Sequence, residues 1–187
     1  PPDHYLRIDY LLTDRIVRQL PDKPRLLQIG AGCGATMLWL KNIIPGAILY
    51  GVERNPRAQQ IASRFMCMYD HWDRLLTEGL TFDAIIISHH LHEMEDAEVQ
   101  LSRIKALLKP DGSLFISALN SLYYQNIVRL VQGLPAVPEA RYHGAELGAM
   151  LAEAGFDIVS NEAKTEVPDA HRGIVDLVCA LGKSGEE

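Results

Sequence analysis

The chain alternates between two hydrophobic patterns. Short continuous apolar runs, which are typical of strands buried on both faces of a sheet, are followed by longer segments with apolar residues at helical spacing. The predicted strands span residues 25–29, 47–52, 65–69, 82–88, 113–117, 156–161 and 175–181. The predicted helices span residues 5–20, 35–44, 55–63, 97–108, 123–132 and 145–154. Gly155 directly follows the last helix, where a glycine favours termination.

This alternation predicts an α/β fold with a mostly parallel sheet that helices bury on both faces. The last two strands are joined by a loop that contains Pro168 and Gly173 but no helix, so we expect an antiparallel last strand. The predicted fold is therefore doubly wound, Rossmann-like and seven-stranded. No composition shift or repeat marks a boundary, so we treat residues 1–187 as a single domain. The chain begins Pro1-Pro2 without an initiator Met, as a processed product or a piece of a longer protein would.

Composition narrows the classes of partner. The 187 residues are 48% hydrophobic, which is enough apolar material for the core of one α/β domain. The net charge is -6, and Lys and Arg are scattered without a basic stripe, so we expect no nucleic acid partner. No apolar run has the length of a membrane span and no signal peptide is evident, so we expect a cytoplasmic protein without a membrane partner. Nothing in the composition indicates an oligomeric state.

A glycine-rich turn follows the first predicted strand. Gly30, Gly32 and Gly34 lie at the carboxyl end of that strand, where open parallel sheets bind ligands and where glycine lets a ligand approach the backbone. Glu53 ends the next strand, at a position suited to accept hydrogen bonds from ribose hydroxyls. Together they predict an adenosine-containing ligand. The turn could instead merely connect strand to helix. With Ala35 in the place of the third glycine, the turn also fits the glycine fingerprint of NAD-binding proteins. Three features argue against NAD as the ligand: the extra glycine at Gly34, the short chain and the antiparallel edge of the sheet.

Several motifs resemble the class I S-adenosylmethionine-dependent methyltransferases over nearly the whole chain. Residues 26–34, LLQIGAGCG, resemble the first motif of that family, and residues 51–56, GVERNP, resemble the second. Residues 82–88 resemble its fourth strand, and residues 107–114, LLKPDGSL, resemble its LLKPGG-L element. The segment 141–156 is similar to the small type 11/12 methyltransferases that are often found beside or fused to glycosyltransferases.

The resemblance implies S-adenosylmethionine as cofactor. The residues that it assigns to cofactor binding are Gly30, Ala31, Gly32, Gly34, Glu53, Arg54, Asp70, His71, Ser88 and His89. Asp70 falls where the family has an acid that contacts the adenine amino group. Gln28 stands where the family commonly has an acid that orients the turn or the methionine amino group, and glutamine carries no charge. Trp72 could pack on the purine or belong to the core.

The densest polar cluster is the segment 88–93, SHHLHE, which directly follows the fourth strand. Imidazole and carboxylate suit zinc or iron, but the segment is a loop turning into a helix and no second ligand cluster is evident, so we predict no metal. A histidine that titrates near neutral pH can take the proton from an oxygen acceptor, which makes His89 and His92 the predicted catalytic bases. They could equally line the cofactor pocket or cap the next helix, because alignment of the reactants alone accelerates methyl transfer strongly.

The sequence therefore predicts S-adenosylmethionine-dependent methyl transfer to a small-molecule acceptor, at oxygen. Two other functions stay open. Gln28 and the missing initiator Met favour a non-catalytic module that binds the cofactor and supports a partner domain. The glycine fingerprint by itself is compatible with an NAD-dependent oxidoreductase.

Overall fold

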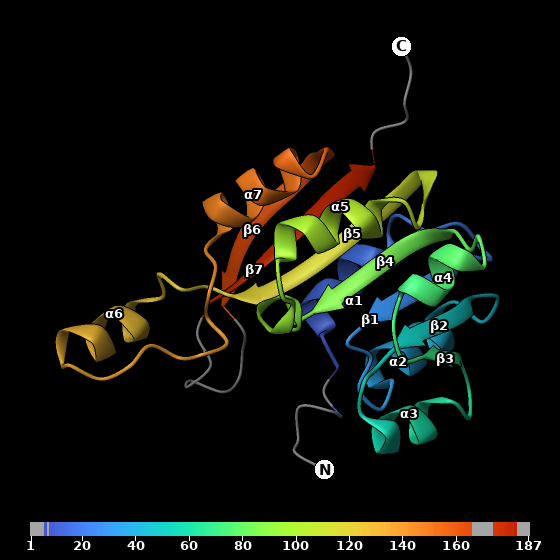
Figure 1. The fold of residues 1–187 in the computed structure, drawn as a ribbon, viewed down its shortest axis with the longest axis horizontal. Helices are drawn as coiled ribbons and strands as arrows, with labels where there is room; N and C mark the ends of the chain where they lie inside the picture. The colour runs from blue at the N-terminus through green and yellow to red at the C-terminus, as the bar shows by residue number, and fades with distance from the viewer. Residues whose placement is uncertain (1–5, 7, 166–173, 183–187) are drawn as a thin grey trace.

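A computed structural model of the chain describes residue 6 and residues 8–165 and 174–182 (Figure 1). In that part of the chain, seven strands form one sheet in the order β3-β2-β1-β4-β5-β7-β6. The first five strands are parallel to their neighbours, whereas β7 lies antiparallel between β5 and β6. The strands are β1 (Arg25–Ile29), β2 (Ile48–Val52), β3 (Cys67–Tyr69), β4 (Phe82–Ser88), β5 (Leu108–Leu119), β6 (Phe156–Thr165) and β7 (Ile174–Gly182). The predicted doubly wound sheet with an antiparallel last strand is confirmed.

Helices cover both faces of this sheet, as predicted. Side chains of α1, α2 and α3 pack on one face, and those of α4, α5 and α7 pack on the other. The helices are α1 (Tyr10–Val17), α2 (Ala35–Ile43), α3 (Pro56–Ala62), α4 (Asp73–Thr77), α5 (Ala97–Lys105), α6 (Tyr124–Val131) and α7 (Gly144–Glu153), with a short 3-10 helix η2 (Leu91–Glu93). Gly155 has a φ of +83°, which confirms it as the residue that ends α7.

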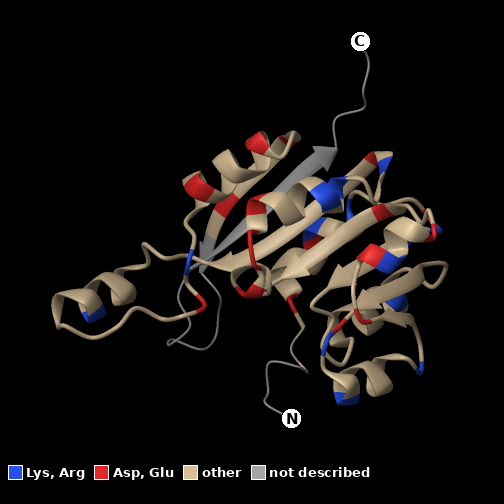
Figure 2. Ribbon diagram, viewed as in Figure 1, with Lys and Arg blue, Asp and Glu red and all other residues tan. Residues whose placement is uncertain are grey.

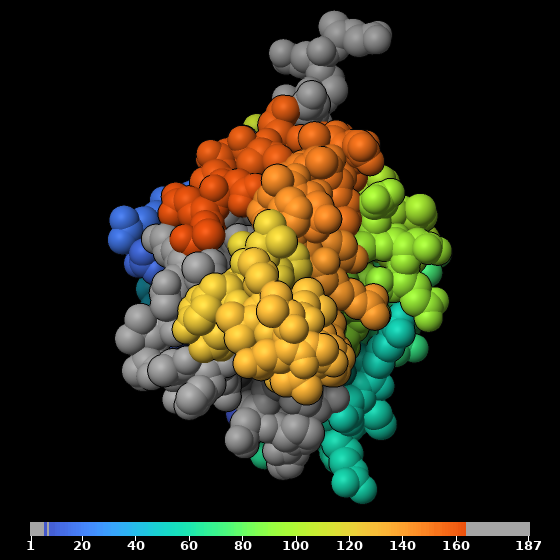
Figure 3. Space-filling model, turned by 90° about the vertical axis from the view of Figure 1, so that its left-hand side faces the viewer, coloured from blue at the N-terminus to red at the C-terminus, as the bar shows by residue number. Residues whose placement is uncertain are grey.

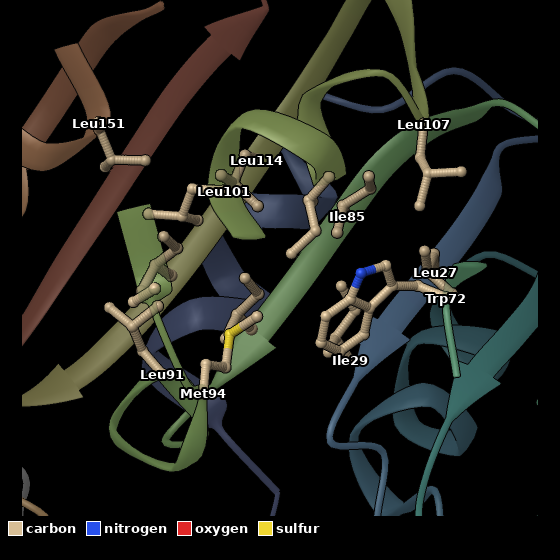
Figure 4. Packing of buried hydrophobic residues seen from close by; sticks show 14 of the residues in the cluster. Leu27, Ile29, Trp72, Ile85, Leu91, Met94, Leu101, Leu107, Leu114 and Leu151 are labelled. Carbon is tan, nitrogen blue, oxygen red and sulfur yellow. The ribbon is translucent and has the colours of Figure 1, made fainter. Parts of the chain in front are cut away.

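The two cores follow from the alternation of side chains along each strand. In β1, Leu26 packs under α1 and α2, whereas Leu27 and Ile29 face the opposite core. Figure 4 shows Trp72 beside Leu27 and Ile29 in that core, and its side chain is buried there. By the same alternation, Gln28 points to the side of α1 and α2. A glutamine buried there needs hydrogen-bond partners.

Several boundaries differ from the prediction, most of all the starts of α1 and β5. Helix α1 begins at Tyr10 because the side chain of Asp9 caps it by accepting a hydrogen bond from the Leu12 N–H at 3.0 Å. The predicted start of this helix, at residue 5, lies outside the described residues. The predicted loop between β6 and β7 lies outside them as well. Strand β5 begins at Leu108, before the predicted residue 113, and Lys109 Nζ contacts both carboxylate oxygens of Asp83 in β4 at 2.8 Å. The five-residue helix α4 was not predicted.

Helix α6 projects from the body of the molecule and forms the yellow-orange bulge in Figure 3. Its exposed apolar side chains include Tyr124, Ile127, Val128, Leu130 and Val131. Figure 2 shows Lys and Arg spread over several elements; the predicted lack of a nucleic acid partner stays a prediction. In the part of the chain that the structure describes, no helix combines the length and the apolar character that a membrane crossing requires.

Candidate functional site

The glycine turn joins the end of β1 to the start of α2. Gly30, Gly32 and Gly34 have φ angles of +71°, +55° and +81°, in the left-handed region that favours glycine. The N–H groups of Gly30 and Ala31 donate to the carbonyl oxygen of Val52 at 2.9 and 3.0 Å. The turn is thereby tied to the end of β2, next to the predicted ribose-binding residue.

Glu53 links the glycine turn to the following helix. Its Oε2 accepts a hydrogen bond from the Gly32 N–H at 2.8 Å, and its Oε1 accepts one from the Asn55 N–H at 2.8 Å. The Glu53 N–H donates to the carbonyl oxygen of Tyr69 at 3.0 Å, which fixes the residue between β2 and β3. A carboxylate in this place holds the turn in shape and still offers lone pairs to a ligand.

Two adjoining hollows lie over the carboxyl ends of the parallel strands. The inner hollow, of about 120 Å³, is lined by Asp9, Gln28, Gly30, Ala31, Gly32, Thr36, Glu53, Ser88, His89, His90 and Glu93. The outer hollow, of about 750 Å³, shares Gly30, Glu53, His90 and Glu93 with it and adds Val52, Arg54, Asn55, Pro56, His71, Trp72, Asp73, Met94, Glu95, Gln100 and Arg103. Because the four shared residues line both hollows, the two hollows together form one cleft.

His90 lies where the two hollows meet. Its ring packs on the glycine turn so closely that a Cβ atom on Gly30 would lie 2.3 Å from His90 Cγ. On the other side, His90 Nδ1 is 3.2 Å from Glu93 Oε2. Burial lowers the pKa of His90, and this effect outweighs the opposing influence of Glu93 and Glu53.

The lowered pKa of His90 makes stability depend on pH. The unfolded chain takes up a proton at His90 near its ordinary pKa of 6.5, before the folded protein does. The stability that neutral His90 contributes is therefore complete above about pH 6.5 and is lost as the pH falls through the lower pKa of the folded state. We expect the free energy of unfolding, measured with urea at a series of pH values, to fall less steeply on acidification in His90→Gln. Parallel curves for the two proteins would contradict this.

His89 follows β4 and lines the inner hollow. Its φ is +49° and its N–H donates to the carbonyl oxygen of Ser117 at 2.9 Å, so the backbone is held in a fixed bend between β4 and β5. The ring is 19% exposed, and its Nε2 lies 3.6 Å from Oδ2 of Asp9. Ser88 donates its hydroxyl to the same carboxylate oxygen at 2.8 Å.

The sequence profile of a family described as "methyltransferase domain" matches residues 3–161, most of the chain. The chain belongs to this methyltransferase family. Membership confirms the predicted enzyme class and, with it, S-adenosylmethionine as the methyl donor. It also decides against the NAD-dependent oxidoreductase. No curated protein sequence matches the chain significantly.

Solved structures share the fold of this methyltransferase. An S-adenosylmethionine-dependent methyltransferase from Methanosarcina mazei has a TM-score of 0.70 at 15% identity, over 90% of this chain and 97% of that one. Magnesium protoporphyrin IX methyltransferase from Synechocystis PCC 6803, with bound S-adenosylhomocysteine, has a TM-score of 0.69 at 17% identity, over 90% and 81%. The cyclase SpnF has a TM-score of 0.74 at 18% identity, over 94% and 81%. At such identities the likeness shows the fold alone, and a cyclase among them illustrates that fold does not fix the reaction.

The residues of the methyltransferase cleft fit S-adenosylmethionine. Gly30, Ala31 and Gly32 bring the backbone of the turn to the wall of the inner hollow, where a ligand can approach it closely. Gln28 lines the inner hollow, and its buried Oε1 accepts no hydrogen bond from any residue that the structure describes. Such an acceptor can receive a hydrogen bond from a donor on a ligand in the hollow.

Most of the predicted site residues come together in this cleft, but three do not. His92 lines a third hollow with Arg141 and Tyr142, because φ of His89 turns the chain before η2 begins and the two imidazoles then face different spaces. Asp70 is exposed and accepts a hydrogen bond from the His71 N–H at 3.0 Å, so its carboxylate closes its own turn. Gly34 lines neither hollow; it starts α2.

The structure also brings in residues that the sequence did not single out for binding. Asp9, Thr36, His90 and Glu93 all line the inner hollow. Asp9 lay inside a predicted helix, and its only local signal is the capping preference of aspartate before a helix. In the described part of the chain, no three His, Cys, Asp or Glu side chains are grouped so as to hold a metal ion.

Proposed function

We propose that this methyltransferase transfers the methyl group of S-adenosylmethionine to an oxygen atom of a small molecule. The observation that carries the proposal is the meeting of three strand ends in one cleft. The glycine turn follows β1, Glu53 follows β2 and the pair Ser88 and His89 follows β4. Ligands of open parallel sheets bind at such a meeting of carboxyl ends.

The cleft divides the proposed contacts to the cofactor between its two hollows. Glu53 faces both hollows and is suited to the ribose hydroxyls, while Arg54 and His71 line the outer hollow on the side proposed for adenine. The backbone of the turn, with Ser88 and His89, lines the inner hollow on the side proposed for the amino-acid part. Because Asp70 lines neither hollow, its proposed contact to adenine needs its side chain to move toward the outer hollow.

Bound S-adenosylmethionine supplies a methyl group on a sulfonium centre, already activated for transfer. The residues of the chain then have to align the acceptor oxygen and accept its proton. His89 is our proposed base, since its ring lines the inner hollow and its backbone is held in the fixed bend between β4 and β5. His92 is the alternative base for an acceptor in the third hollow, which meets the outer hollow at Glu93 and Met94.

Calorimetry with S-adenosylmethionine, S-adenosylhomocysteine and NAD tests the first half of the proposal. We expect both adenosyl compounds to bind and NAD not to bind. Transfer of a labelled methyl group to panels of small hydroxyl, amine and thiol compounds tests the second half, with hydroxyl compounds expected to react. Binding of NAD alone would overturn the assignment, and cofactor binding without transfer to any acceptor would favour the non-catalytic module.

We further propose that residues 1–187 act as one domain in the cytoplasm. The strands of the single sheet are drawn from residues 25 to 182, and β7 from the end of the chain lies beside β5. The cleft is bounded by this one sheet and its own helices, which is consistent with a small-molecule acceptor.

A further inference from the structure

We propose that Asp9 and Gln28 together bind the ammonium group of the amino-acid part of the cofactor, with Asp9 supplying the negative charge that Gln28 lacks. The two residues come from distant segments, one before α1 and one near the end of β1, and both line the inner hollow. The assignment rests on the proposed function, because it concerns how the same cleft holds S-adenosylmethionine.

Gln28 provides the first half of this ammonium site. Its side chain is 4% exposed, and Oε1 has no hydrogen-bond partner among the described residues. Buried polar atoms are satisfied in folded proteins, so an acceptor that faces a hollow without a partner points to a donor on a ligand. An ammonium group has three such donors and no acceptor.

Asp9 provides the charge. Its side chain is also 4% exposed, and the hydrogen bonds that it accepts from residues the structure describes come from neutral groups. Oδ1 accepts from the Leu12 N–H at 3.0 Å, while Oδ2 accepts from the hydroxyls of Ser88, at 2.8 Å, and of Ser117. His89 Nε2, at 3.6 Å from Oδ2, is too far for a hydrogen bond.

Buried carboxylates are normally paired with a cation. A carboxylate offers about four lone-pair sites, and the three neutral donors leave room for one more. The geometry therefore suits a ligand cation that enters the inner hollow and contacts Asp9 and Gln28. It also explains how the chain can carry a glutamine before the glycine turn: the N-terminus of α1 brings a carboxylate to the same face of β1.

Two ligands separate this site from the rest of the cleft. S-adenosylhomocysteine carries the amino-acid group, and 5′-methylthioadenosine lacks it but keeps the nucleoside. We expect Asp9→Asn to weaken S-adenosylhomocysteine binding about tenfold in calorimetry and to leave 5′-methylthioadenosine binding unchanged. Asparagine is a good helix cap, so the start of α1 is kept. The matched control is Asp14→Asn on the exposed face of α1, which should change neither affinity.

A rescue experiment tests the link between the two residues. Gln28→Glu, introduced into Asp9→Asn, returns a carboxylate to the inner hollow and should restore most of the lost affinity for S-adenosylhomocysteine. An unaltered affinity in Asp9→Asn, an equal loss for both ligands, or a failed rescue would overturn the shared ammonium site. If the unsubstituted protein bound neither ligand, the proposed function itself would fail, which is a different result.

Discussion

Glu53→Ala is expected to weaken the binding of S-adenosylhomocysteine by about 1–3 kcal/mol, or about 5- to 150-fold. The Glu53 carboxylate is placed to accept hydrogen bonds from ribose hydroxyls, and such charge-assisted bonds are stronger than neutral ones. It also accepts the N–H groups of Gly32 and Asn55, both at 2.8 Å, so its removal frees two donors that shape the turn. Calorimetric titration of the variant and the unsubstituted protein measures the loss.

A pair of simpler ligands distinguishes a lost ribose contact from a loosened turn. The unsubstituted protein should prefer adenosine to 2′,3′-dideoxyadenosine, and Glu53→Ala should abolish most of that preference. Glu153→Ala removes an exposed carboxylate of α7 that lines neither hollow of the cleft and serves as the control, with both affinities unchanged. If Glu53→Ala kept the preference for adenosine, another residue would have to bind the ribose hydroxyls.

The place of Glu53 in the cleft could be predicted because its signal is local. A carboxylate at the end of the strand after a glycine turn needs only the order of strands along the chain, and the parallel pairing of β1 with β2 places the two ends together. Asp9 gives no such signal, because its role depends on where α1 packs over β1 and β4. His90 is similar: its contact with Gly30 arises from the bend at His89, which no periodicity reveals.

The sheet was easier to predict than the helical layer for a related physical reason. Strands buried on both faces are continuously apolar, and β1 and β4 have the predicted bounds because the run and the buried segment coincide. Helix α4 has one turn and a single buried side chain, Leu75, so it leaves almost no periodic pattern. Strand β5 starts early because pairing with β4 extends past Lys109, whose contact with Asp83 is a tertiary feature.

Gly34→Ala is expected to lower the free energy of unfolding by about 2–6 kcal/mol. The φ of +81° costs a residue with a side chain about 1–3 kcal/mol. A Cβ atom would also lie 2.6 Å from Phe65 Cζ and 2.9 Å from Met66 Cε, and such overpacking costs about 1–3 kcal/mol more. Urea unfolding followed by circular dichroism measures the sum. The glycine is thus required by the start of α2, although it lines neither hollow.

Two controls divide this loss into backbone strain and steric contact. Gly79 has a φ of +65°, and a Cβ atom there would meet nothing within 4 Å, so Gly79→Ala should cost the strain alone, about 1–2 kcal/mol. Phe65→Ala removes the ring that the new Cβ atom would strike most closely, so in that background Gly34→Ala should cost less than in the unsubstituted protein, although Met66 Cε still lies 2.9 Å from the new Cβ atom. Equal losses for Gly34→Ala with and without the Phe65 ring would mean that the turn, and not the packing of α2 against the segment before β3, dictates glycine at this position.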